Sequence, residues 1–173
     1  MKALLKKWFI GASGVAALEF SLVGIPFVLM TVGILEMAMM FTAQSVLQES
    51  VSTASRLIRT GQLQKSAAGG QEAMFKDAVC DFAAIFIPCA DIDFQVQKLD
   101  NFADASDAPA YDEDGNLIET PFDAGGANDV VMIRVLYNYP VMTPMMGQML
   151  ATRKTDNTRR LVSTIVLQAE PYE

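Results

Sequence analysis

The sequence predicts an α+β protein: a long N-terminal helix, transmembrane in its first half, leads into a small domain of one or two helices on a three- or four-stranded antiparallel sheet. Three observations support this. The first residues form a long apolar stretch, two segments after it repeat with helical periodicity, and three later segments alternate as strands do. We expect a basic leader over residues 1–14, a transmembrane helix over 15–43 and a folded domain over 44–173.

The apolar stretch is long enough to cross a membrane. From Trp8 to Gln48 the only charged residues are Glu19 and Glu36, and Phe20–Leu35 holds sixteen uncharged residues in a row. Continued to Phe41, it exceeds the ~20 residues that span the hydrocarbon core. A secretory signal peptide is the competing interpretation, but its apolar part runs only ~7–15 residues before a small-x-small cleavage site. No such site follows convincingly here, so we favour a retained transmembrane helix.

The charges around this helix predict its orientation. Lys2, Lys6 and Lys7 precede it, and no acidic residue comes before Glu19, so the N-terminus should stay in the cytoplasm. The remainder then lies across the membrane. Beyond residue 14 the chain holds ten basic and twenty acidic residues, a net charge of −10 against −7 for the whole.

The helix should continue past the membrane to residue 60. Its apolar positions recur at three- and four-residue spacing and form one stripe: Leu47, Val51, Ala54 and Ile58. Arg56 and Arg59 suit the last turn, and Gly61 suits the position that ends a helix. A continuous helix from Val15 to Thr60 would be about 69 Å long at 1.5 Å per residue.

A second amphipathic helix is predicted over residues 71–86, ended by Pro88. Cys80 and Cys89 lie on either side of its end. Across a membrane, two cysteines so close in sequence most simply form an intramolecular disulfide. Two buried free thiols remain the alternative.

Strands are predicted over residues 91–97, 130–139 and 160–170. Between the first two, residues 100–129 hold nine acids and no base, which predicts a solvated loop. A calcium-binding EF-hand loop here would place Ala110 and Pro121 at ligand positions, so a turn at Asp114-Gly115 is favoured instead. The methionine-rich residues 141–150 should form either a small satellite core or a contact with a neighbouring subunit.

The composition argues against several functions. The chain has no histidine, which excludes His-dependent triads and His-metal sites, and two cysteines cannot form a four-ligand zinc site. Its acidic charge argues against nucleic-acid binding. We find no phosphate-binding loop and no nucleophile elbow, so we expect neither an enzyme nor a cofactor or metal.

The start of the apolar stretch carries a resemblance. The residues Gly14-Val15-Ala16-Ala17-Leu18-Glu19-Phe20 resemble the processing site of type IV-type prepilins, and the pairing of the glutamate with an aromatic residue is similar to the tight-adherence (Tad, or Flp) branch. The resemblance implies cleavage between Gly14 and Val15, with Glu19 as the fifth mature residue. The new amino group, with a pKa near 8, could pair with Glu19 of a neighbouring subunit and set the register of a filament. Alternatively, Glu19 only reaches the lipid headgroups.

The C-terminal half carries a weaker resemblance. The run Arg134–Pro140, the pair Thr143-Pro144 and the ending Gln168–Tyr172 are similar to TadE-like and TadF-like minor pilins, which are pseudopilins. Residues 100–129 depart from that pattern. The family implies a single-pass protein of the bacterial inner membrane with a periplasmic domain. Its implied partners are a prepilin peptidase, the major Flp pilin, other minor pilins, and the pilus platform and ATPase complex.

Two other functions stay open from the sequence. A pseudopilin of a type II secretion system would have the same N-terminal features, and a bitopic receptor would use its periplasmic domain to bind a ligand. Leader cleavage separates the receptor from both pilin functions. Neither the choice between TadE-like and TadF-like nor the position at tip, base or shaft of a pilus follows from the residues.

Overall fold

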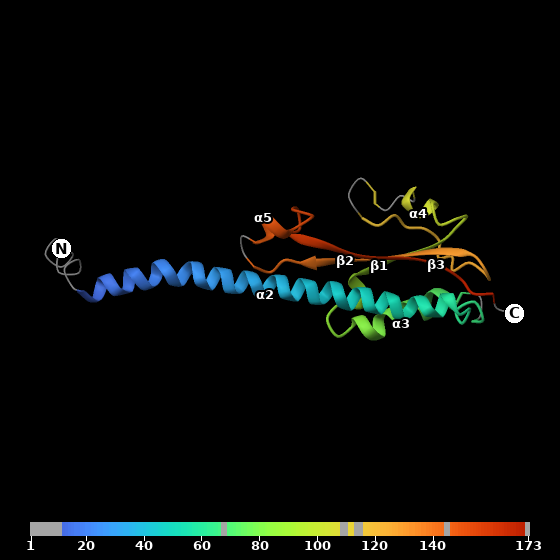
Figure 1. The fold of residues 1–173 in the computed structure, drawn as a ribbon, viewed down its shortest axis with the longest axis horizontal. Helices are drawn as coiled ribbons and strands as arrows, with labels where there is room; N and C mark the ends of the chain where they lie inside the picture. Colours follow the sequence, from blue (N-terminus) through green and yellow to red (C-terminus); the bar gives the residue numbers. More distant parts are fainter. Residues whose placement is uncertain (1–11, 67–68, 108–110, 113–115, 144–145, 172–173) are drawn as a thin grey trace.

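The computed structural model describes residues 12–66, 69–107, 111–112, 116–143 and 146–171. A single helix, α2 (Ala12–Arg59), extends far beyond a head, our name for the folded residues 61–171, which packs on its C-terminal half (Figure 1). The head contains α3 (Gln71–Ala83), the short η1 (Cys89–Asp91), β1 (Ile92–Leu99), α4 (Asp104–Asp107), β2 (Val130–Pro140), α5 (Met146–Leu150) and β3 (Thr158–Gln168). The predicted α+β class is confirmed.

The long helix is continuous over 48 residues, including Pro26. It ends where the sequence predicts, because Gly61 adopts a φ of 72°, a left-handed conformation that glycine tolerates best. The Gly61 amide then donates to the carbonyl of Ile58 at 3.1 Å, which satisfies one of the free carbonyls at the helix end.

The sheet has three antiparallel strands in the order β1-β2-β3. Val96 of β1 lies opposite Ile133 of β2, which lies opposite Ile165 of β3. The three predicted strands are therefore present, with ends shifted by at most two residues, and the sheet has the smaller of the two strand numbers expected.

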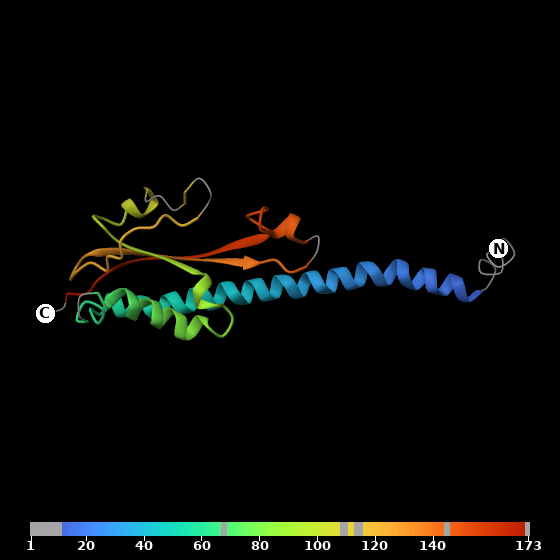
Figure 2. The same ribbon diagram turned by 180° about the vertical axis from the view of Figure 1, so that it is seen from behind.

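One face of the sheet packs on α2 and α3, which lie together on the same side of it (Figures 1 and 2). The predicted stripe of α2 is confirmed as core, since all four of its side chains are fully buried: Leu47, Val51, Ala54 and Ile58. Phe75 and Val79 of α3 and Ile133 of β2 join the same cluster. Because burial of a large apolar side chain contributes about 1.5–3 kcal/mol, this contact fixes the head on the helix.

The opposite face lies beneath parts of the acidic segment 100–129 (Figure 1). Arg134 on β2 is buried and donates to Oε1 of Gln95 at 2.8 Å, while Nε2 of Gln95 donates to the Ile118 carbonyl at 3.2 Å. Leu117 is also buried, and Ala124 is buried in the cluster that α2 and α3 form with the sheet, so the expectation of a solvated loop is wrong for these residues. The turn predicted at Asp114-Gly115 lies outside the described residues, and Tyr111 bridges Leu117 on either side of it.

Candidate processing and assembly site

The predicted processing motif lies in the first turns of α2, away from the head. From Gly14 to Val32 every residue is exposed except Gly24, which is half-buried. Val15 is 56% exposed and Phe20 is 78% exposed. Val15 and Glu19 are four residues apart in the helix and so lie on one face. The head therefore leaves all the motif residues open to a peptidase or to another helix.

The two hydroxyl groups between Gly14 and Val32 both bond within the helix. The Ser21 hydroxyl donates to the Leu18 carbonyl at 2.9 Å, and the Thr31 hydroxyl donates to the Phe27 carbonyl at 2.8 Å. A spanning segment must satisfy its polar groups internally, since hydrocarbon offers no hydrogen bonds. Among the described residues, one helix is long and apolar enough to cross a membrane, and it covers Gly14–Arg59. The helix thus fits a single-pass membrane protein.

Burial on α2 begins abruptly at Gly33. Glu36, Met40 and Ala43 follow as buried positions at spacings of three and four residues, and they continue directly into the core stripe. The head therefore covers one side of the helix well before residue 43, where the sequence predicts the transmembrane segment to end. A methyl group added at Gly33 would lie 3.2 Å from Cε of Met146, so α5 approaches the helix closely at this level.

Glu36 is the most constrained carboxylate of the helix. It is 6% exposed and accepts three hydrogen bonds from the chain after β2: from the Met142 amide at 3.2 Å, the Thr143 amide at 3.1 Å and the Thr143 hydroxyl at 2.7 Å. A buried carboxylate is tolerated when such donors surround it. Glu36 therefore attaches the end of the head nearest the exposed half of α2 to the helix.

The sequence signal for Glu36 is its spacing. Glu36 precedes Met40 by four residues and Ala43 by seven, on the side of the helix that becomes buried. A charge near the end of an apolar stretch is equally typical of a solvated helix edge, and the residues alone favour neither interpretation. Its donors lie more than a hundred residues later, and no local pattern reveals them.

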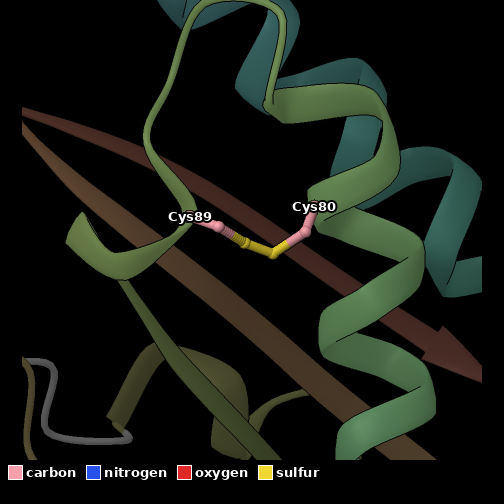
Figure 3. The surroundings of a disulfide bond; sticks show 2 residues. All are labelled: Cys80 and Cys89. Atoms are coloured by element: carbon pink, nitrogen blue, oxygen red, sulfur yellow. A yellow bond between two sulfur atoms is a disulfide. The ribbon is translucent and has the colours of Figure 1, made fainter.

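A disulfide joins Cys80 on α3 to Cys89 at the start of η1 (Figure 3). Their Cα atoms are 5.6 Å apart, within the usual range for a bridge. The predicted disulfide is therefore present. Helix α3 ends at Ala83, three residues before the predicted end at residue 86. A turn then leads the chain through Pro88 back to Cys89. The bridge ties the end of α3 to the beginning of the sheet.

The carboxylates of the head do not form a metal centre among the described residues, where no three His, Cys, Asp or Glu side chains converge suitably. Burial raises the pKa of Asp93, and the negative charge of Glu119 raises it further, while Arg153 opposes the shift. Such a carboxyl group can sit near a protein surface for structural reasons alone. We therefore place the candidate functional site on α2, which carries the predicted processing motif and the contact of Glu36 with the head.

Comparison with known proteins agrees with this placement. Residues 14–56 match the family model described as TadE-like protein. The match begins at the glycine of the predicted cleavage site and covers the exposed half of α2 and most of its core stripe. No curated protein and no solved structure matches the chain.

The match confirms the predicted resemblance to TadE-like proteins over this segment. It supports a pilin-like role associated with the Tad pilus. The head lies wholly beyond the matched residues, so its function rests on its own geometry.

Proposed function

We propose that this chain is a structural minor pilin, or pseudopilin, that acts in assembly of a Tad (Flp) pilus. The division of α2 carries the proposal: its first half is exposed on all sides and starts with a processing motif, while its second half forms the core of a head. An exposed apolar helix held rigidly on a folded head suits storage in a membrane and later packing against other helices.

In this mechanism the span holds the subunit in the inner membrane, with its leader in the cytoplasm and its head in the periplasm. A prepilin peptidase cuts between Gly14 and Val15, and the new amino group of Val15 comes to lie at the membrane edge. Glu19 of one subunit pairs with that amino group on the next and sets their register. The subunit then joins the major Flp pilin and other minor pilins, driven by the platform and ATPase complex. No catalytic step is assigned to the chain.

The cleavage is tested by the mass and N-terminal sequence of the protein isolated from membranes. We expect a chain that begins at Val15 in cells with the prepilin peptidase and at Met1 in cells without it. Gly14→Leu should block processing, because a side chain at this position obstructs the peptidase, whereas the matched change Gly24→Leu in the same apolar helix should leave it intact. An intact Met1 in peptidase-containing cells would exclude the pilin functions and favour a receptor.

The assembly role is tested in a deletion strain. We expect loss of surface pili with protein secretion unaffected, and restoration of pili by the unaltered chain. Glu19→Ala should be processed but should restore few or no pili, because the Val15 amino group then lacks its partner. Glu49→Ala removes an exposed carboxylate from the outer part of the same helix and should restore pili fully.

The phenotypes of these strains distinguish a Tad pilus subunit from a type II secretion pseudopilin. Loss of secretion with pili retained would identify a type II secretion pseudopilin instead. Normal pili with Glu19→Ala would contradict the register role of Glu19 but would leave the structural role of the subunit in place.

A further inference from the structure

The end of the head that faces the exposed half of α2 carries two solvent-exposed methionines. Met142, directly after β2, is 68% exposed, and Met149 on α5 is 81% exposed. Both belong to a corner, our name for residues 141–143 and 146–150, that the contacts of Glu36 with Thr143 and of Gly33 with Met146 hold against the helix. The two methionines are thus exposed at the level where the exposed half of α2 begins.

The level of this corner along α2 coincides with the expected membrane surface. Val15 to Leu35 is 21 residues, about 31 Å of helix at 1.5 Å per residue, which matches a hydrocarbon core ~30 Å thick. With Val15 at the cytoplasmic edge, the far edge of the core falls beside Gly33 and Glu36. Helix α5 lies at the end of the head nearest the exposed half of α2 (Figure 1), so the corner lies at the level where we expect the span to leave the membrane.

Basic residues follow this corner in the sequence although the protein is acidic as a whole. Arg153, Lys154, Arg159 and Arg160 lie in one short stretch with a single acid, Asp156. Arg159 donates to the Leu150 carbonyl at 3.2 Å, which places it beside α5. Arg153 pairs with Asp156 at 3.4 Å, whereas Lys154 and Arg159 are exposed. A cationic rim around apolar side chains complements anionic lipid headgroups.

We propose that residues 141–143 and 146–150 form a second membrane contact, in which Met142 and Met149 insert into the outer leaflet and Lys154 and Arg159 bind anionic phospholipid headgroups. The occupant is the lipid surface itself, because Met146 of this corner lies against Gly33, next to the exposed apolar side chains of Ile34 and Leu35 on the span. The contact would fix both the depth of the span and the tilt of the head. It depends on the span and is independent of the pilus role.

The test uses the full chain, reconstituted in phosphatidylcholine vesicles with and without phosphatidylglycerol. A Met149→Cys variant carries a nitroxide on its new thiol, since Cys80 and Cys89 are bridged. Relative accessibility to oxygen and to a water-soluble nickel complex then gives the depth of the label. We expect the label about 5–10 Å below the phosphates, the usual depth of an interfacial apolar face.

Phe102→Cys provides the matched control, because Phe102 is 55% exposed beside Arg59 and Glu170, at the far end of the head. Its label should remain in water in both vesicles. A label at 149 that is as accessible to nickel as the label at 102 would overturn the proposal. So would a label at 149 that becomes shielded only when a second subunit is added, which would identify a subunit contact.

A separate experiment tests whether Lys154 and Arg159 bind anionic headgroups. Phosphatidylglycerol should move the label at 149 deeper, and Lys154→Gln with Arg159→Gln should abolish that difference while leaving insertion into phosphatidylcholine. An equal response to phosphatidylglycerol in the charge variant would overturn the role of these two residues.

Discussion

Replacement of Glu36 by alanine is expected to destabilise the head by about 3 kcal/mol, because hydrogen bonds to a charged group contribute about 1.5–3 kcal/mol each and do not add fully. The change leaves the amides of Met142 and Thr143 without their acceptor at a buried position. Urea unfolding of the purified chain in detergent micelles, followed by circular dichroism, measures the loss.

Two variants calibrate this result. Glu49→Ala removes an exposed carboxylate from the same helix and should change stability by less than about 0.5 kcal/mol. Thr143→Val removes one of three donors and should cost about 1 kcal/mol, since both amides keep their acceptor. Equal urea midpoints for Glu36→Ala and Glu49→Ala would show that the hydrogen bonds of Glu36 to Met142 and Thr143 do not contribute to stability.

Removal of the disulfide by Cys80→Ser with Cys89→Ser is expected to cost about 2.5 kcal/mol, the loop-closure contribution of a short loop. The bridge spans a sequence separation of nine and restrains the passage from α3 to β1. The same unfolding measurement, with and without a thiol reductant, gives the difference.

The serine variant also serves as the control for reduction. The reductant should lower the midpoint of the unaltered chain toward that of the double variant and leave the double variant unchanged. Coincident midpoints for oxidised and reduced protein would mean that the bridge does not contribute to stability.

The elements of this fold follow from local patterns. The stripe of α2, the helix end at Gly61 and the alternation in β2 and β3 all depend on residues a few positions apart, and each is found where the sequence predicts it. Helix α3 is three residues shorter than expected, because apolar residues continue past Ala83 into the turn that the disulfide closes.

Contacts between distant segments were harder to predict. Arg134 lies inside a strongly apolar strand, and its partner Gln95 is 39 residues away on a different strand. The burial of Leu117 is equally hard to predict, since it follows the acidic run Asp112-Glu113-Asp114, a pattern typical of a solvated loop. For Arg134 the decisive neighbour comes from strand order and register, which no single segment encodes.

The methionine-rich residues 141–150 show the same limit. The sequence predicts either a satellite core or a contact with a neighbouring subunit. In the structure Val141 and Gly147 are buried, while Met142 and Met149 are exposed. The division depends on how the corner meets Gly33 and Glu36 on a helix more than a hundred residues earlier.

The long exposed half of α2 also limits how this subunit can move. Transfer of each large exposed apolar side chain from hydrocarbon to water costs about 1.5–3 kcal/mol of free energy. These side chains include Phe20, Phe27 and Leu35. Summed over the span, extraction into water is uphill by tens of kcal/mol on that scale. The subunit therefore cannot pass through an intermediate in which this helix is free in water. The helix can leave lipid only by moving sideways against another apolar surface. Contacts with lipid must therefore be replaced directly by contacts with that surface.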